Sequence, residues 1–244
     1  MVSAKSVYLT IMSMLLVVTA SCSLEKTVAA IPANAEPISF MTADGVTLSG
    51  HIFGSGDGGV ILSHMWRDDE SRWFDFASDL SDKGYSVLTY NFRGYGNSKE
   101  KRDVALIDRD LEAAVKTLKE HRNIEKLYLI GSSMGGTASI KVAAHESVSA
   151  LVVLSAPVEI SKLDSKNDVA LVKAPKLFIY SENDVIANES AKYFLDNGKE
   201  PIFSEALVGS EHGTDILYGE NGPRIKDMIV RFIDRNGVSR AENR

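Results

Sequence analysis

The stretch Leu127-Tyr128-Leu129-Ile130-Gly131-Ser132-Ser133-Met134-Gly135-Gly136 decides the fold of this chain. An apolar run typical of a buried strand leads into Gly-x-Ser-x-Gly, and helix-forming residues follow it. The pattern predicts a strand, a sharp turn and a helix, with Ser133 pushed out at the apex of the turn. The flanking glycines are needed because side chains there would collide with the neighbouring helix and strand. Ser133 is therefore the candidate nucleophile. The bare motif arises by chance roughly 0.1 times in a chain of this size, so the strand before it and the helix after it carry the argument.

Further strands are expected on both sides of this stretch, because short apolar runs recur along the chain. They are Ile38–Met41, Val46–Phe53, Val60–His64, Tyr85–Tyr90, Ala150–Leu154, Lys176–Tyr180 and Pro201–Leu207. Asp44-Gly45 suits a tight hairpin turn between the first two. Apolar residues at helical spacing predict helices from Asp69 to Lys83, from Val104 to Leu118, after Ser133 and after Pro223.

Strands that alternate with helices predict an α/β fold, because parallel neighbours need helical crossovers. We expect eight strands in a mostly parallel sheet with helices on both faces, the first two strands joined as a hairpin and the rest separated by helices. Sites in such sheets form at the carboxyl ends of the strands. The candidate residues described below all follow a strand.

The composition narrows the class of protein. A chain of 244 residues with 44% hydrophobic content can bury a large core in one domain. The formal charge of −6 and the absence of a basic stripe argue against a nucleic-acid partner. Cys22 is the single cysteine, so neither an intramolecular disulfide nor a cysteine-based metal site can form. We expect no metal and no organic cofactor.

The N-terminal residues have the pattern of an export signal. Lys5 precedes Val7–Ala20, an apolar segment too short for a comfortable transmembrane helix but suited to the h-region of a secretory signal. Ala20 and Ser21 then lead into Cys22. This resembles a bacterial lipoprotein signal, in which cleavage precedes the cysteine and the cysteine is lipidated. Thr19 departs from the aliphatic residue that is usual three positions before that cysteine.

The expected organisation is a lipoprotein-type signal peptide over residues 1–22, a tether over 23–37, a folded domain over 38–237 and a tail over 238–244. The resemblance implies an exported protein held at the bacterial cell envelope through a lipid on Cys22. Ordinary cleavage after Ala33-Asn34-Ala35 and an uncleaved anchor remain alternatives.

A serine nucleophile needs a base, usually a histidine. Among five histidines, His212 lies in a glycine-flanked loop just after the last expected strand, where its ring can reach toward Ser133. His64, which ends the third strand, is the alternative base. The other three, expected to be surface or packing residues, are His51, His121 and His145.

The base in turn needs an oriented partner. Asp184 lies in the loop that leaves the seventh strand, which brings its carboxylate to the same edge of the sheet. Glu182 and Glu159 are possible substitutes. An aspartate in such a loop can also be a turn residue that accepts a hydrogen bond from its own backbone.

From about Ile38 to Gly237 the sequence resembles the α/β-hydrolase family. The order Ser133, Asp184, His212 matches that family and excludes the chymotrypsin and subtilisin orders. The loop from Asn91 to Ser98 is similar to the Arg-Gly-x-Gly-x-Ser loop of many members, and its expected role is structural.

Acyl transfer also needs N–H donors aimed at the oxyanion, each worth about 3 kcal/mol. Met134 N–H, immediately after the nucleophile, is expected to be one. The family usually shows His-Gly-x after the third strand, where this chain has His64-Met65-Trp66. We assign the second donor to Trp66 N–H, with Met65 N–H as the alternative. Trp73 is expected to be a packing residue.

Only Ser155–Pro175 separates the sixth strand from the seventh, too little for the helical cap of many relatives. The resemblance is therefore to compact, capless esterases, acyl-thioesterases and dienelactone-hydrolase-like enzymes. It implies hydrolysis of a small-molecule carboxylic ester or thioester through an acyl-serine intermediate. A peptidase or amidase using the same three residues, and a surface-tethered binding protein without turnover, remain alternatives.

Overall fold

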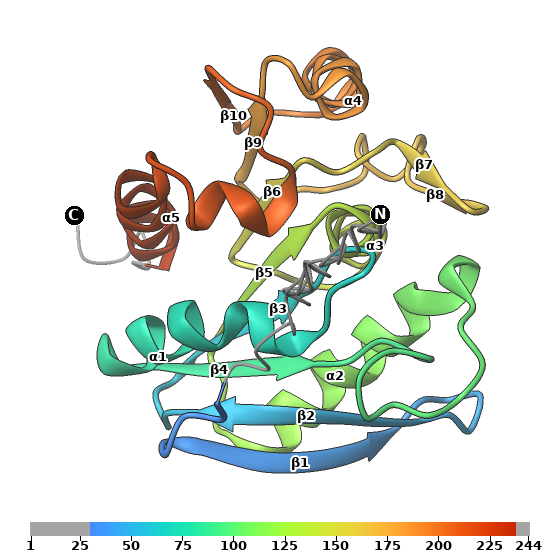
Figure 1. Cartoon of the computed structure of the whole chain (residues 1–244), viewed down its shortest axis with the longest axis vertical. Coiled ribbons are helices and arrows are strands. Elements are labelled where there is room, and N and C mark those ends of the chain that lie inside the picture. The colour runs from blue at the N-terminus through green and yellow to red at the C-terminus, as the bar shows by residue number, and fades with distance from the viewer. Residues whose placement is uncertain (1–29, 238–244) are drawn as a thin grey trace, which may run out of the picture.

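The computed structural model describes residues 30–237. Its centre is an eight-stranded sheet in the order β1-β2-β4-β3-β5-β6-β9-β10, seen from bottom to top in Figure 1. The strands are β1 (Ala35–Met41), β2 (Thr47–Phe53), β3 (Gly58–Ser63), β4 (Tyr85–Tyr90), β5 (Lys126–Ser132), β6 (Ala150–Leu154), β9 (Lys176–Ser181) and β10 (Ile202–Leu207). Strand β2 runs antiparallel to β1 and β4, and every other pair in the sheet is parallel. The predicted fold class is confirmed.

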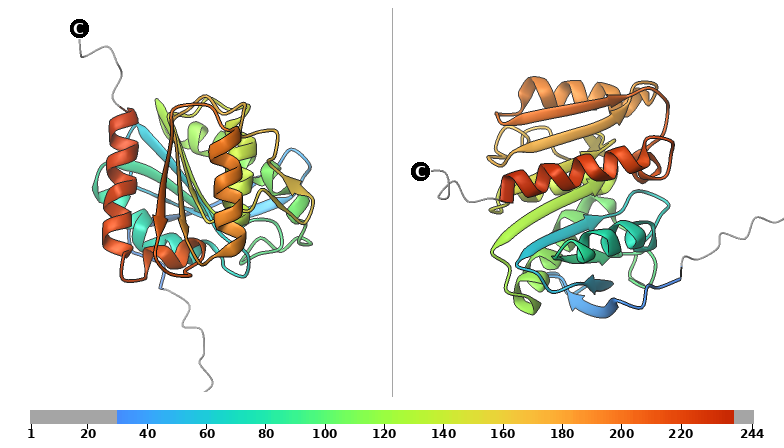
Figure 2. Two further views of the ribbon diagram at one scale, coloured as in Figure 1. Left: turned by 90° about the horizontal axis from the view of Figure 1, so that it is seen from above. Right: turned by 90° about the vertical axis from the view of Figure 1, so that its left-hand side faces the viewer.

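Five α-helices cover the two faces of the sheet. They are α1 (Phe74–Asp82), α2 (Ile107–His121), α3 (Met134–Ala143), α4 (Val185–Asn197) and α5 (Gly222–Gly237). Apolar side chains of α1 and α5 share one core with the sheet, and those of α2, α3 and α4 share the other. Figure 2 shows α4 and α5 on opposite sides of the strands. The central parallel strands β3, β4, β5 and β6 therefore lie buried between two helical layers.

The sheet begins earlier in the chain than the sequence predicts. Ala35 already pairs with Phe53, so residues 35–37, which are expected from the sequence to lie in the tether, belong to β1. Pro37 is tolerated there because β1 is an edge strand, where a missing N–H breaks no ladder. The expected signal peptide, residues 23–29 of the tether and the tail over 238–244 lie outside the described residues.

The prediction that helices separate all strands after the hairpin is wrong between β6 and β9. That segment instead contains a small hairpin, β7 (Glu159–Ile160) with β8 (Leu163–Asp164), followed by turns. Ser155, Ser161 and Lys162 have positive φ angles there, which no helix accommodates. The segment Ser155–Pro175 contains no α-helix that could cover the carboxyl edge of the sheet.

Helix α4 is the helix expected between the last two sheet strands, and its own residues have a clear helical pattern. Asp184 caps its first turn, and Ala187, Ala191 and Phe194 recur at helical spacing on its buried side. Across residues 30–237, no helix has both the length and the apolar composition needed to cross a bilayer.

Candidate active site

Ser133 lies at the junction of β5 and α3 in a strained backbone conformation, with φ 50° and ψ −120°. A non-glycine residue adopts such a φ only when its surroundings enforce it. The surroundings here are tight: a Cβ built on Gly131 would lie 2.3 Å from Gly135 O, and one built on Gly135 would lie 2.5 Å from Ser63 O. The glycines of the motif thus let α3 approach β5 and β3 closely. Ser133 remains only 4% exposed.

His212 reaches Ser133 from the loop after β10. Its Nε2 lies 2.8 Å from Ser133 Oγ, and its Nδ1 lies 2.5 Å from Asp184 Oδ2. Because the carboxylate of Asp184 can only accept, Nδ1 carries the proton and donates a hydrogen bond to Asp184. Nε2 is then left with a lone pair that accepts the hydrogen bond of the Ser133 hydroxyl. The structure therefore brings together the three residues that the sequence selects, from three separate loops.

Asp184 uses its two carboxylate oxygens for two purposes. Oδ2 accepts from His212, and Oδ1 accepts from Ala187 N at 3.4 Å and caps α4. Asp184 thus fills both roles considered for it: it caps the backbone of its own turn and it is the partner of the histidine. Among the described side chains it is Asp184, and neither Glu182 nor Glu159, that bonds His212.

The loop that carries His212 is tied to the neighbouring loop at two points. Ser181 Oγ donates to Glu211 O at 2.7 Å, and Asn183 N donates to Gly209 O at 2.9 Å. Gly213 has φ 60°, and a Cβ built on it would lie 2.4 Å from Ser132 Oγ and 2.7 Å from Met65 Sδ. Sequence reasoning missed Ser181, because a serine that ends a strand carries no pattern of its own.

His64 is not available as a base, so that alternative is wrong. The ring is fully buried, its Nδ1 donates to Met65 O at 2.9 Å, and its Nε2 accepts from Phe92 N at 3.1 Å. Burial away from water lowers the pKa of His64 to about 4, because the charged ring would lose its hydration. His64 therefore stays neutral and joins the loop after β3 to the loop after β4.

The remaining histidines have partners other than Ser133. His51 is buried and contacts Glu70, His121 bonds Thr117 O on its own helix, and His145 is exposed at the end of α3. These are the packing and surface positions that the sequence predicts for them.

The two backbone segments expected to supply donors to an oxyanion are the start of α3 and the turn after β3. Met134 is the first residue of α3, so its N–H has no acceptor within the helix and lies at the positive end of the helix dipole. Met65–Asp68 forms a turn after β3, in which Asp68 N donates to Met65 O at 3.4 Å. Trp66 keeps its side chain at the surface, while Trp73 is fully buried against Phe76 and is a packing residue, as predicted.

Arg72 joins the loop after β3 to the turn after His212, which sequence reasoning did not find. Its guanidinium lies 2.6 Å from Asp215 Oδ1 and 3.6 Å from Asp68 Oδ2. The same group lies 4.3 Å from the centroid of the Tyr218 ring, and the Tyr218 hydroxyl donates to Arg72 O. Asp215 and Tyr218 are more than 140 residues from Arg72 in sequence, so only the folded chain reveals these contacts.

Arg93, in the loop after β4, holds two further segments together from a buried position. It donates to Asp110 Oδ1 on α2 at 2.8 and 2.6 Å, and to Asp44 in the β1–β2 turn at 2.9 and 3.0 Å. The guanidinium holds the pKa of Asp44 well below its usual range. The contacts of Arg93 are therefore structural.

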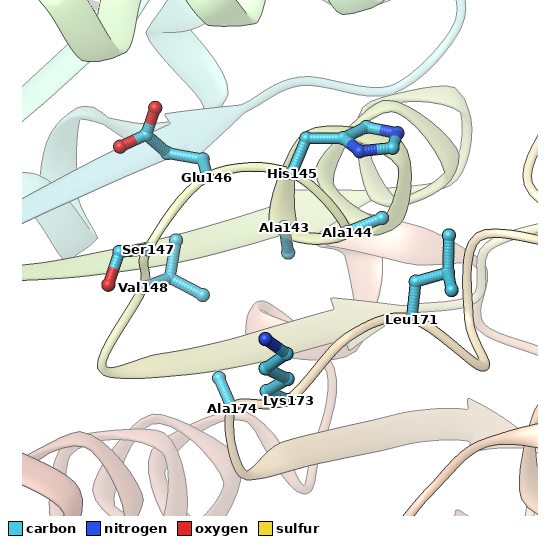
Figure 3. Close-up of a pocket in the computed structure, with 9 residues that line it drawn as sticks. All are labelled: Ala143, Ala144, His145, Glu146, Ser147, Val148, Leu171, Lys173 and Ala174. Atoms are coloured by element: carbon cyan, nitrogen blue, oxygen red, sulfur yellow. The ribbon is translucent and has the colours of Figure 1, made fainter.

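A separate pocket of about 220 Å³ lies at the far end of α3. Figure 3 shows its lining residues, which come from the end of α3, the turn after it and the segment before β9. A ten-residue helix is about 15 Å long, so this pocket is remote from Ser133. In the part of the chain that the structure describes, no three histidine, cysteine, aspartate or glutamate side chains form a cluster that could hold a metal ion.

Comparisons with known proteins agree with this architecture. The uncharacterized protein YfhR of Escherichia coli K12 is 23% identical over 232 residues, covering 83% of this chain and 81% of YfhR. Human alpha/beta hydrolase domain-containing protein 17B is 25% identical over 189 residues, covering 70% of this chain and 65% of the relative.

Solved structures with the same fold include two at about one-fifth identity. The esterase Pf2001 of Pyrococcus furiosus superimposes with a TM-score of 0.72 at 22% identity, covering 82% of this chain and 92% of the esterase. The alpha/beta hydrolase GrgF of Penicillium sp. sh18 gives 0.73 at 19% identity, covering 83% and 98%. A family model described as the alpha/beta hydrolase fold matches residues 54–181, just over half of the chain, which includes the Ser133 turn. This chain belongs to the α/β-hydrolase fold family.

Proposed function

We propose that this protein is a serine hydrolase that cleaves a carboxylic ester or thioester through an acyl-serine intermediate. The observation that carries the proposal is the pair of hydrogen bonds from Ser133 to His212, at 2.8 Å, and from His212 to Asp184, at 2.5 Å. A binding protein has no need of this arrangement on a strained backbone. An activated serine does.

The reaction begins when Ser133 Oγ attacks the carbonyl carbon and His212 Nε2 takes the hydroxyl proton. Met134 N–H and Trp66 N–H, or Met65 N–H in its place, would stabilise the oxyanion of the tetrahedral intermediate. His212 then gives its proton to the departing alcohol or thiol, which leaves the acyl-serine.

A water molecule completes the cycle. His212 Nε2 takes a proton from the water as it attacks the acyl-serine, and collapse of the second intermediate releases the carboxylic acid. The proton returns from His212 to Ser133 Oγ. Asp184 remains ionised throughout, keeps the ring in the required tautomer and stabilises the imidazolium that forms twice in each turnover.

The first experiment is labelling with a fluorophosphonate probe, together with hydrolysis of short p-nitrophenyl esters. The purified protein should be labelled at Ser133 and should show a burst of p-nitrophenol. Ser133→Ala should lose both, while Ser204→Ala, which changes an exposed serine on β10, should keep both. Turnover by Ser133→Ala equal to that of the unmodified protein would remove the assignment. Matched ester and amide substrates separate an esterase from a peptidase or amidase.

We also propose that the protein is exported and anchored through a lipid on Cys22. The support is the sequence pattern of residues 1–22 alone, which lie outside the described residues. Mass spectrometry of the membrane fraction should find the mature N-terminus at a modified Cys22. Cys22→Ala should then move the protein out of that fraction, and an unmodified cysteine within an intact leader would contradict the proposal.

A further inference from the structure

Several exposed apolar side chains lie on the loops that carry the triad or pack beside those loops. Within residues 30–237, the large apolar side chains that face solvent are Ile31, Met41, Trp66, Leu171, Val185, Ile186, Phe203, Val208 and Tyr218. Val185, Ile186 and Val208 lie on the segments that carry Asp184 and His212, and Trp66 lies on the turn that packs beside Gly213; we call these four of the nine residues the apolar rim. Single exposed apolar residues are ordinary, but a group at one edge of a sheet indicates a binding surface.

Three members of the rim lie on the two segments that carry Asp184 and His212. Val185 and Ile186 directly follow Asp184 and are 64% and 66% exposed. Val208 is 82% exposed and directly follows β10. The bond from Asn183 N to Gly209 O, at 2.9 Å, holds the chain next to Val208 against the chain next to Val185.

The fourth member approaches from the loop after β3. Trp66 follows Met65, whose Sδ lies against Gly213, the residue after His212. Its side chain is 36% exposed, whereas the other tryptophan of the chain is fully buried. The rim residues thus come from three segments: the loop of Asp184, the loop of His212 and the turn after β3.

The rim does not serve the folding of the chain. Helix α4 packs on the sheet through Ala187, Ala191 and Phe194, while Val185 and Ile186 face away from that core. β-Branched residues are also poor choices for helix stability. A helix start chosen for stability and solubility would have polar residues at these two positions.

We propose that the apolar rim binds the hydrocarbon chain of the acyl group, so that the substrates are esters or thioesters of medium-chain or long-chain fatty acids. This inference rests on the proposed function, because an acyl group bonded to Ser133 must extend from that point across the neighbouring surface. Ser155–Pro175 contains no α-helix that could enclose the hydrocarbon chain. The hydrocarbon chain would therefore lie on an open surface, with the rim on one side and solvent on the other.

The size of the effect follows from hydrocarbon transfer. Full removal of one methylene from water is worth roughly fourfold in affinity, so a methylene covered on one side should contribute about twofold. The ratio of kcat/KM for p-nitrophenyl octanoate to that for the acetate should then be at least tenfold in the full chain, measured below the micelle concentration of the ester.

Substitutions in the rim test which surface carries this preference. The octanoate-to-acetate ratio should fall at least fivefold in the double variant Val185→Ser, Ile186→Ser, and more weakly in Val208→Ser. Met41→Ser is the matched control, because Met41 is 67% exposed on β1, four strands from β5 and roughly 19 Å away. Thermal unfolding close to that of the unmodified protein verifies that each variant is folded.

The outcomes separate this inference from the proposed function. If the acetate is not hydrolysed and Ser133 is not labelled, the serine-hydrolase proposal itself fails. If the acetate is hydrolysed but the ratio stays near one, or if the rim variants keep the ratio of the Met41→Ser control, the acyl-chain subsite is wrong and the hydrolase stands.

Discussion

A substitution of Asp184 should affect catalysis strongly and stability only weakly. Asparagine at position 184 still caps a helix well, so α4 should keep its first turn. The amide would instead donate to His212 Nδ1 and favour the wrong tautomer, leaving Nε2 protonated and unable to accept from Ser133. We expect Asp184→Asn to lower kcat by roughly 10³ to 10⁴ and the free energy of unfolding by less than about 1 kcal/mol.

Kinetics and urea unfolding of the same preparation check this prediction. Glu182→Gln is the control, because Glu182 is the neighbouring carboxylate and is exposed. A loss of activity in Glu182→Gln comparable to that in Asp184→Asn would mean that the acid has been misassigned.

His64 should make stability depend on pH. Its pKa falls from 6.5 to about 4 in the folded protein, so the unfolded chain binds the proton more readily. The stability that this difference contributes is complete above the unfolded pKa and is lost as the pH falls from 6.5 toward about 4. Between about pH 7 and about pH 4.5, we expect a loss of roughly 2 to 3 kcal/mol from His64.

Urea unfolding at the two pH values measures this loss. His64→Asn has no group that titrates in that window, and its amide can still donate to Met65 O. The variant should be less stable than the unmodified protein at neutral pH. Its free energy of unfolding should also fall less between the two pH values, by the amount assigned to His64. A variant with an unchanged pH dependence would show that another group is responsible.

At the scale of elements, the turn between β5 and α3 depends on glycine for a reason of space. A Cβ on Gly135 would lie 2.5 Å from Ser63 O and 2.7 Å from His64 O, both backbone atoms that cannot yield cheaply. We expect Gly135→Ala to lower the free energy of unfolding by about 3 kcal/mol, because α3 must move away from β3. Denaturant unfolding tests this.

Gly84, at the end of α1, is the matched control. It has φ 89° and open space around the position of a Cβ, so alanine meets conformational strain without a collision. Gly84→Ala should cost about 1 kcal/mol. Equal effects of the two substitutions would mean that a collision with the backbone of β3 adds nothing to the cost at position 135.

The elements also show where sequence patterns predict well and where they fail. All eight sheet strands are predictable. The central ones are buried on both faces and therefore read as short apolar runs, whereas the edge strands β1 and β10 are partly exposed. The segment between β6 and β9 is not predictable, because the expectation of a crossover helix comes from the general rule and not from its own residues. Positive φ angles at Ser155, Ser161 and Lys162 have no distinct sequence pattern, since serine and lysine rarely adopt them.

At the scale of the whole molecule, Arg93 connects α2 and the β1–β2 turn from a buried position. Lysine cannot reproduce its forked hydrogen bonds to Asp110 and Asp44, and Asp110 is fully buried. We expect Arg93→Lys to destabilise the protein by about 3 kcal/mol, measured by denaturant unfolding. Arg109→Lys, which changes an exposed arginine 3.4 Å from the same Asp44, should cost less than about 0.5 kcal/mol. Equal losses would contradict a structural role for the buried pair.

The sequence by itself determined the fold class, the position of the Ser133 turn and the selection of Asp184 and His212. Each of these follows from local patterns, since apolar runs, glycines beside a serine and residues placed after strands can all be recognised in the sequence itself. Only the tertiary structure decided the tautomer and neutrality of His64, the Ser181 and Arg72 contacts that hold the loops, and the gathering of the apolar rim. These depend on segments that are far apart in the chain, and their contacts exist only once the parallel sheet has brought its carboxyl ends to one edge.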